Sequence, residues 1–151
     1  MVTVQHEAYE SIKDEIKDLL AEHWREIALY QDRIALNPNW KEYARLAAAH
    51  ALRCYTVRSD GVLVGYVVLV VSTSLHYSDH LFATNDVIYI KPEHRKGTTG
   101  WRLIKFAEQQ LRAEGVSLMT VNTKVHAPFD PLMERLDFDY IERLYAKCLR
   151  G

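Results

Sequence analysis

The stretch that most constrains the fold is "VLVGYVVLVV", residues 62–71. It is apolar at odd and even positions alike, so a strand formed by it has to be covered on both sides. A sheet with one face in water would instead alternate apolar and polar residues. The run is about half as long as a helix needs to cross a bilayer, and a glycine interrupts it. We therefore expect a buried central strand with helices on both sides, and no membrane span.

Hydrophobic periodicity places further helices and strands around this central strand. Asp60-Gly61 suits the positive backbone angles of a tight hairpin. Pro38 disfavours helix at Asn37 and separates two helices. The expected elements are a short strand at 2–4, helices at 12–34 and 40–51, two strands within 52–74, a strand at 81–91, a helix ending near 114, a strand at 116–125, a short helix at 127–136 and a final strand at 138–149.

This order predicts one α/β (α+β) domain over residues 1–151, since no repeat, linker or low-complexity segment suggests a boundary. The formal net charge of -1 gives no general attraction to nucleic acid, which is not favoured as a partner. The N-terminus lacks the basic flank and apolar core of a signal peptide, and the two cysteines form no disulfide-like pattern. A cytoplasmic location is expected.

The segment "HRKGTTGW", residues 94–101, places two glycines and two adjacent basic residues between a strand and a helix. A helix N-terminus offers unpaired N–H groups and partial positive charge, so a phosphate fits there if the backbone can approach closely. The alternative is a tight turn with Arg95 and Lys96 in solvent. Two phosphate motifs are excluded, because Trp101 stands where GxxxxGK[ST] needs lysine and the spacing of GxGxxG is absent.

With this loop and its flanking elements, the chain resembles the GNAT superfamily of N-acetyltransferases, whose cofactor motif is (R/Q)-x-x-G-x-(G/A). Arg95 and Gly100 match the first and last positions, whereas Thr98 stands at the middle glycine. The segments "LHY", "LNPNW" and "ERLYAKCL" resemble small members encoded by tailed phages and prophages. The resemblance implies a GNAT fold, with a central mixed, mostly antiparallel sheet of six to seven strands and about four flanking helices.

The same resemblance implies acetyl-coenzyme A (acetyl-CoA) as the cofactor, its pyrophosphate held by backbone amides of the loop. The cofactor-binding residues that it implies are Ile88, Tyr89, Ile90, Arg95, Lys96, Gly97, Thr98, Thr99, Gly100 and Trp101.

Acetyl transfer to an amine requires a group that removes a proton, since a lysine-like amine has a pKa near 10.4. Asp86 is the first candidate, in the strand that leads to the loop, where alternation would put Thr84, Asp86, Ile88 and Ile90 on one face. The alternative for Asp86 is a structural carboxylate. His76 is the second candidate base, because histidine exchanges protons near neutral pH, and its alternative is a packing residue.

Aromatic residues indicate where an acceptor could bind. Tyr30, Trp40 and Tyr43 surround the break between the first two helices, a region that forms much of the acceptor wall in the GNAT family. Tyr77 follows the central strand and is a further acceptor-site candidate. The alternative is that these side chains only pack, as amphipathic helices require.

Many GNAT enzymes protonate the leaving thiolate with a tyrosine in a "YEKLGF"-like segment. Here the segment is "MERLDF", with Met133 at the tyrosine position and Asp137 at the glycine. Family topology leaves His126 and Tyr145 as the nearest donors, and the alternative is a thiolate that departs unassisted. His76 and His80 are spaced like metal ligands on a helix, but their segment reads as a loop, so no metal is implied.

We therefore expect an N-acetyltransferase that moves the acetyl group of acetyl-CoA directly to a primary amine. No covalent intermediate is expected, because neither Cys54 nor Cys148 has an activating partner. The acceptor is left open between a small molecule, a protein amine and a modified base, and a homodimer is possible. The alternative function is a non-catalytic GNAT-fold module of phage origin.

Overall fold

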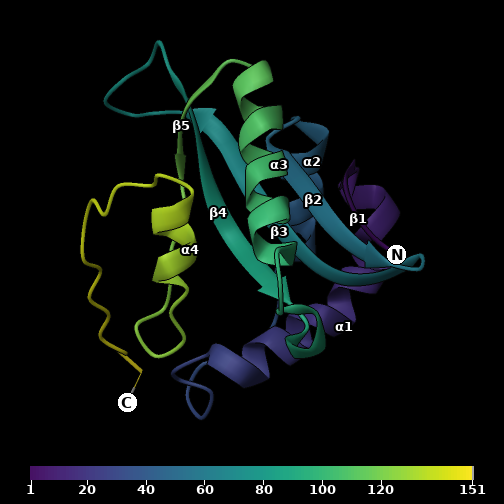
Figure 1. Ribbon diagram of the computed structural model, residues 1–151. Helices are drawn as coiled ribbons and strands as arrows, with labels where there is room; N and C mark the ends of the chain where they lie inside the picture. Colours follow the sequence, from purple (N-terminus) through teal and green to yellow (C-terminus); the bar gives the residue numbers. More distant parts are fainter. Residues whose placement is uncertain (151) are drawn as a thin grey trace.

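The computed structural model describes residues 1–150, which form a five-stranded sheet with helices on both faces (Figure 1). The strands follow each other across the sheet in chain order, β1-β2-β3-β4-β5. The first four strands are antiparallel, and β5 runs parallel to β4. The elements are β1 (Val2–Glu7), α1 (Tyr9–Ile27), α2 (Trp40–Ala48), β2 (Leu52–Ser59), β3 (Val62–Thr73), β4 (Leu81–Ile90), the 3-10 turn η1 (Pro92–His94), α3 (Thr99–Ala113), β5 (Val116–Thr120) and α4 (Asp130–Arg135).

The central strand predicted from the apolar run is β3, the third of the five strands. Its alternate residues enter two different hydrophobic cores: Tyr66 and Val68 join the cluster formed with α1, and Val67 and Leu69 join the cluster formed with α3. Figure 1 shows α3 crossing one face of the sheet. Helices cover both sides of β3, which confirms the prediction made from its two apolar faces. None of the helices in residues 1–150 is both long and apolar enough to cross a membrane.

Two predicted helices end earlier than periodicity indicated. α1 stops at Ile27, where the side-chain amide of Gln31 donates to the carbonyls of Trp24, Arg25 and Ala28. These bonds satisfy carbonyls that the next helical turn would otherwise have used. α2 stops at Ala48, and the backbone turns out of the helix through the left-handed conformation of His50.

The predicted final strand is wrong. Residues 138–150 form no strand or helix, so the sheet has five strands rather than six or seven. The predicted strand at 116–125 also ends early, at Thr120. Alternating apolar residues describe what a strand would bury, but a strand also needs a neighbour for its backbone hydrogen bonds, and that neighbour is set by tertiary structure.

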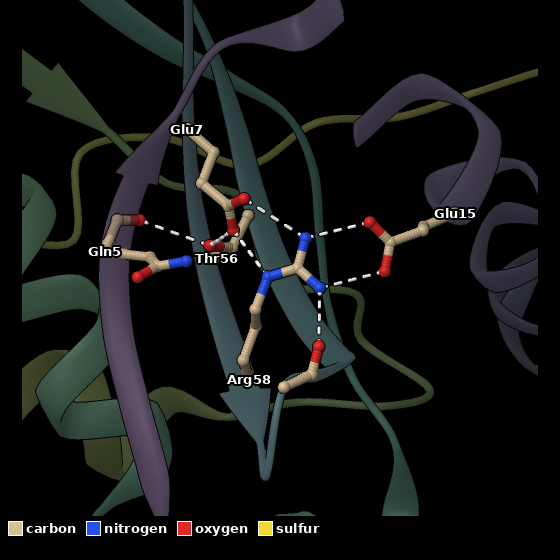
Figure 2. A network of polar contacts seen from close by, with 6 residues as sticks. Gln5, Glu7, Glu15, Thr56 and Arg58 are labelled. Carbon is tan, nitrogen blue, oxygen red and sulfur yellow. Dashed lines mark hydrogen bonds and ion pairs between the residues drawn. The ribbon is translucent and has the colours of Figure 1, made fainter. Parts of the chain in front are cut away.

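An ion-pair network fastens β1, β2 and α1 together (Figure 2). The guanidinium of Arg58 on β2 lies between two carboxylates, at 2.9 Å from Glu7 on β1 and 2.8 Å from Glu15 on α1. The hydroxyl of Thr56 also donates to Glu7. Burial raises the pKa of the Glu7 carboxyl, but the hydrogen bonds from Arg58 and its neighbours outweigh burial and lower that pKa to about 2. The network holds α1 against the edge of the sheet that β1 forms.

Candidate active site

A bulge in β4 carries the first candidate residue. Val68 on β3 pairs with Val87, whereas the next residue, Leu69, pairs with Asn85, so Asp86 is the extra residue that has no partner across the ladder. A bulge shifts the alternation of side chains by one position. The expected common face is therefore wrong: Ile88 packs toward the α3 core, whereas Asp86 meets α2 on the opposite face.

β4 and β5 separate beyond this bulge. Their parallel pairing covers only Leu81 to Thr84 on β4 and ends at Thr120 on β5. Where the two strands separate, the backbone N–H of Asn122 donates to the side-chain oxygen of Asn85 at 2.8 Å. From residue 86 to residue 90, the edge of β4 that faces β5 has no strand beside it. This fork leaves backbone groups of β4 without a partner strand, and of these the Ile90 carbonyl accepts a hydrogen bond from Arg95 instead.

A cleft of about 90 Å³ opens in the fork between β4, the end of α1 and the loop after β5. Its polar lining residues are His23, Asp86, Lys124, Asn85 and Asn122. Apolar side chains line the remainder, namely Ile27, Val87, Ile88, Ala127 and Phe129. The cleft thus combines polar residues that could bind an amine with apolar residues that would contact the rest of a ligand.

The His23 ring stacks on Tyr89 of β4, with 5.0 Å between the ring centroids. Burial lowers the pKa of His23 below its usual value of 6.5, and Lys124 and Arg95 act in the same direction, whereas Glu26 opposes them. The imidazole is therefore neutral at pH 7 and able to accept a proton.

On the other side of the bulge, the hydroxyl of Tyr43 on α2 donates a hydrogen bond to the Asp86 carboxylate. Burial, together with this carboxylate, raises the pKa of Tyr43 far above its usual value. Tyr43 therefore stays protonated and acts as a fixed hydrogen-bond donor that orients Asp86.

The glycine turn leads directly into α3. Gly97 has a φ of +77°, a conformation that favours glycine, and Thr98 precedes the first helical residue without a side-chain cap. The first backbone hydrogen bond of this end runs from Arg102 to the Thr98 carbonyl at 2.8 Å. The preceding amides of the first turn have no helical acceptor, and no acidic residue stands among them. This end of α3 is suited to an anion.

Arg95 is engaged within the protein. Its side chain donates to the Ile90 carbonyl at 2.7 Å and to the Glu26 carboxylate at 2.7 and 2.9 Å. The guanidinium also lies over the Tyr89 ring, at 5.4 Å from the centroid. Arg95 thus fastens the glycine turn to the end of α1, next to His23.

The sequence matches the model of the acetyltransferase (GNAT) family over residues 13–138. The chain belongs to this family. GNAT members use acetyl-CoA, and the match makes the chain an acyl-CoA-dependent N-acetyltransferase. No curated protein matches the sequence closely enough to count as a relative.

Solved structures with the same fold share little sequence with this GNAT chain. An aminoglycoside acetyltransferase from an uncultured soil metagenomic sample has a TM-score of 0.76 at 13% identity, with 99% of each chain covered. A ribosomal-protein-alanine N-acetyltransferase from Brucella melitensis biovar Abortus has a TM-score of 0.67 at 17% identity, with 100% of each chain covered. A predicted acetyltransferase from Clostridium acetobutylicum, solved with acetyl-CoA, has a TM-score of 0.71 at 8% identity, covering 99% of this chain and 97% of that one. These likenesses show the fold.

The glycine turn of this GNAT chain could hold a pyrophosphate. A Cβ atom on Gly100 would lie 3.3 Å from the Leu132 side chain and 3.9 Å from that of Ile90, so the turn has little room for a side chain here. Lys96 adds an exposed cation, and the α3 amides add donors. The turn and the open edge of β4 are the parts of the chain that could hold acetyl-CoA.

Several residues singled out from the sequence lie away from the cleft. His76 and Tyr77 are exposed in the loop between β3 and β4, and Tyr77 stacks on Phe82. This loop precedes β4, whereas the glycine turn follows it, so the two loops lie at opposite ends of that strand. Within residues 1–150, no group of three or more His, Cys, Asp or Glu side chains is arranged to hold a metal ion.

Other predicted residues are closer to the site. His126 lies in the loop that lines the cleft, and its Nε2 contacts the Ile27 carbonyl at 2.7 Å. Trp40 packs against the α1 core beside Tyr43, and Tyr30 lies beneath the Arg33 guanidinium just past α1. Tyr145 is 84% exposed in the segment without secondary structure and lines no part of the cleft.

The sequence analysis missed His23 and Lys124. His23 lies near the C-terminal end of α1, and the apolar periodicity of this helix describes only its buried stripe, so nothing in the sequence marked His23 as facing a cleft. Lys124 was placed inside a predicted strand. Both face the cleft because β4 and β5 diverge, and no local sequence pattern reports that divergence.

Proposed function

We propose that this chain transfers the acetyl group of acetyl-CoA to a primary amine bound in the cleft between β4 and β5. The observation that carries the proposal is the fork itself. It lies near a helix end suited to an anion, leaves part of a strand edge without a partner strand, and holds a cleft lined by both Asp86 and His23.

Bound acetyl-CoA would supply the acetyl group as an activated thioester. The amides at the start of α3, together with Lys96, would bind its pyrophosphate. The edge of β4 beside residues 86–89, which has no partner strand, would pair with the amide groups of its pantetheine arm, as a neighbouring strand would. Arg95 would act indirectly, by fixing the turn to α1 through Glu26.

In this proposal Asp86 orients the amine and His23 removes its proton. A primary amine arrives as an ammonium ion, and the Asp86 carboxylate, held by Tyr43, attracts and orients it. The neutral His23 imidazole then takes its proton, directly or through a water molecule. Neither His76 nor Tyr145 lines the cleft, so we assign no step to them. In this proposal His126, in the loop that lines the cleft, would aid the departing thiolate, and a dedicated acid is not required.

The acceptor is a primary amine on a small molecule or on a protein. Aminoglycosides and a ribosomal protein are named for two proteins of the same fold, and both carry amines. The resemblance to phage-encoded members stays a prediction, and so does a modified base as acceptor.

The decisive experiment is a mass-spectrometric screen for products heavier by one acetyl group, using acetyl-CoA with amine libraries and cell extracts. The wild-type chain should yield an acetylated amine, and a His23→Gln variant that still binds acetyl-CoA should yield far less. Acetyl-CoA at about a hundred times its Kd should also raise the free energy of unfolding by about 2.7 kcal/mol. Stabilisation by acetyl-CoA without any acetylated amine would favour a binding module over an enzyme.

A further inference from the structure

Two residues of opposite charge line the cleft: Asp86 on β4 and Lys124 in the loop after β5. Both are exposed, so both carry their charge at pH 7. The Tyr43 hydroxyl donates to Oδ2 of Asp86, and Oδ1 has no hydrogen bond within residues 1–150. Among the ion pairs of the described residues, none includes Asp86 or Lys124. The cleft therefore presents one unpaired negative charge and one unpaired positive charge.

The charged groups of α1 next to the cleft are already paired. The carboxylate of Glu26 accepts two hydrogen bonds from Arg95, and that of Glu22 lies 3.8 Å from the amine of Lys91. These pairs leave no excess of negative charge beside the cleft. A bound molecule would therefore meet one carboxylate and one ammonium, whose charges sum to zero.

The backbone of Lys124 is fixed beside the cleft. The Ala127 amide donates to the Lys124 carbonyl at 3.1 Å, and Nε2 of His126 contacts the Ile27 carbonyl at 2.7 Å. Figure 1 shows this loop, between β5 and α4, next to the end of α1. Lys124 is among the cations that lower the pKa of His23, so its ammonium lies near the imidazole. The turn thus keeps the cation at the cleft.

We propose that the acceptor is a small amino acid, a zwitterion in which one carboxylate accompanies the primary amine. Its ammonium would bind to Asp86 beside His23, as in the proposed function on which this inference rests, and its carboxylate would bind to Lys124. The apolar residues Ile27 and Phe129 would contact the carbon chain between the two charged groups. Lys124 is then the residue that selects the acceptor.

Other classes of amine match the charges of the cleft less well. An aminoglycoside or a polyamine would bring further ammonium groups near Lys124, where like charges repel. A simple alkylamine would leave Lys124 without a partner in a partly apolar cleft. The volume of the cleft, about 90 Å³, also favours a small molecule. An amino acid pairs with both charges at once.

Steady-state kinetics with matched amines test the proposal on the full chain. Each set compares an amino acid with the alkylamine and the diamine of the same chain length, from glycine with ethylamine and ethylenediamine up to aminohexanoate. The three members differ only in a terminal carboxylate, methyl or aminomethyl group. At saturating acetyl-CoA, we expect kcat/KM of the best amino acid to exceed that of its alkylamine by at least about tenfold, and that of its diamine by more.

Variants of Lys124 show whether this residue causes the preference. Lys124→Gln should abolish it, mainly by raising KM for the amino acid, and Lys124→Glu should make the diamine the best acceptor of its set. Because Lys124 lowers the pKa of His23, Lys124→Glu should also move the acid decline of kcat/KM to higher pH. The matched control is Lys41→Glu, because Lys41 is exposed on α2 and lines no part of the cleft. This control should keep the preference for the amino acid.

The outcomes separate this inference from the proposed acetyl transfer. If the wild-type chain acetylated alkylamines or diamines as efficiently as amino acids, the inference would be overturned and the acetyl transfer would stand. A preference for amino acids that persisted in Lys124→Glu would also overturn it. If the chain bound acetyl-CoA but acetylated no amine at all, the proposed function would fail, and this inference with it.

Discussion

The Tyr43 hydroxyl on α2 donates a hydrogen bond to the Asp86 carboxylate at the bulge of β4. The bond joins the second helix to the one residue of β4 that the strand ladder leaves out. The bulge turns Asp86 toward this helix, and the tyrosine then fixes the direction of the carboxylate. A residue of α2 thereby orients the side chain of a residue that lines the cleft.

Asp86→Asn removes the charge that, in our proposal, attracts the acceptor ammonium. We expect kcat/KM for the amine to fall about a hundredfold, the low end for such groups, while the Kd of acetyl-CoA changes less than about twofold. Steady-state kinetics and calorimetry measure the two quantities. Tyr43→Phe is the matched control, since it keeps the carboxylate and loses only its orienting bond, and it should cost less than about tenfold. Full activity in Asp86→Asn would remove Asp86 from the mechanism.

The role of His23 predicts a pH dependence. Burial lowers the pKa of His23 below 6.5, so the imidazole is mostly neutral at pH 6.5 and above. It becomes protonated when the pH falls through its lowered pKa. The value of kcat/KM should therefore decline on the acid side of pH 6.5. His23→Gln should lower activity about a hundredfold and abolish this acid limb. His76→Gln, at the other end of β4, should leave kcat/KM and its decline in acid unchanged. If His76→Gln abolished the decline and His23→Gln did not, His76 would be the base.

Gly100 tests the cofactor turn. In Gly100→Val the new side chain would collide with Leu132 or enter the space in front of the α3 amides. We expect acetyl-CoA binding to weaken by at least about tenfold, or about 1.4 kcal/mol. Gly115→Ala, at the far end of α3, should cost about 1 kcal/mol of stability because its φ is +86°, but leave that affinity unchanged. Equal affinity in both variants would place the cofactor elsewhere.

Glu7 should control stability in acid. Its pKa is about 2 in the folded protein and 4.5 when unperturbed, so its stabilisation is complete above pH 4.5 and is lost as the pH falls toward 2. Glu7→Gln should lower the free energy of unfolding by about 2 kcal/mol at pH 7 and flatten its decline in acid. Urea unfolding across this pH range measures both effects. Glu15→Gln, on the more exposed arm of the Arg58 pair, should cost less than about 1 kcal/mol.

The thiolate needs no dedicated acid if our proposal is right. Tyr145→Phe and His126→Ala should each lower kcat by less than about a hundredfold, measured at saturating acetyl-CoA. A loss of several thousandfold in either variant, with folding and cofactor affinity intact, would reveal a proton donor in place of the tyrosine that Met133 replaces.

Local sequence patterns determined most of the framework of this protein. The two apolar faces of β3, the hairpin at Asp60-Gly61 and the glycine turn before α3 were all predictable, because each depends on the conformation or burial of neighbouring residues. The family could also be recognised from the sequence, because the strand, glycine turn and helix that resemble it, from β4 through α3, follow one another in the chain. The same patterns failed for residues 138–149, where the segment has the composition of a strand but pairs with no strand of the sheet.

Tertiary structure alone decided the cleft. The bulge at Asp86 follows from how β3 and β4 align, and the fork follows from where β5 leaves β4. These events bring His23, Asp86 and Lys124 to one cleft, although positions 23 and 124 are 101 residues apart in the chain. Sequence periodicity reports which face of an element is buried, because burial acts on each element separately. Sequence periodicity does not indicate strand register or the point where two strands separate, since both depend on packing across the whole sheet.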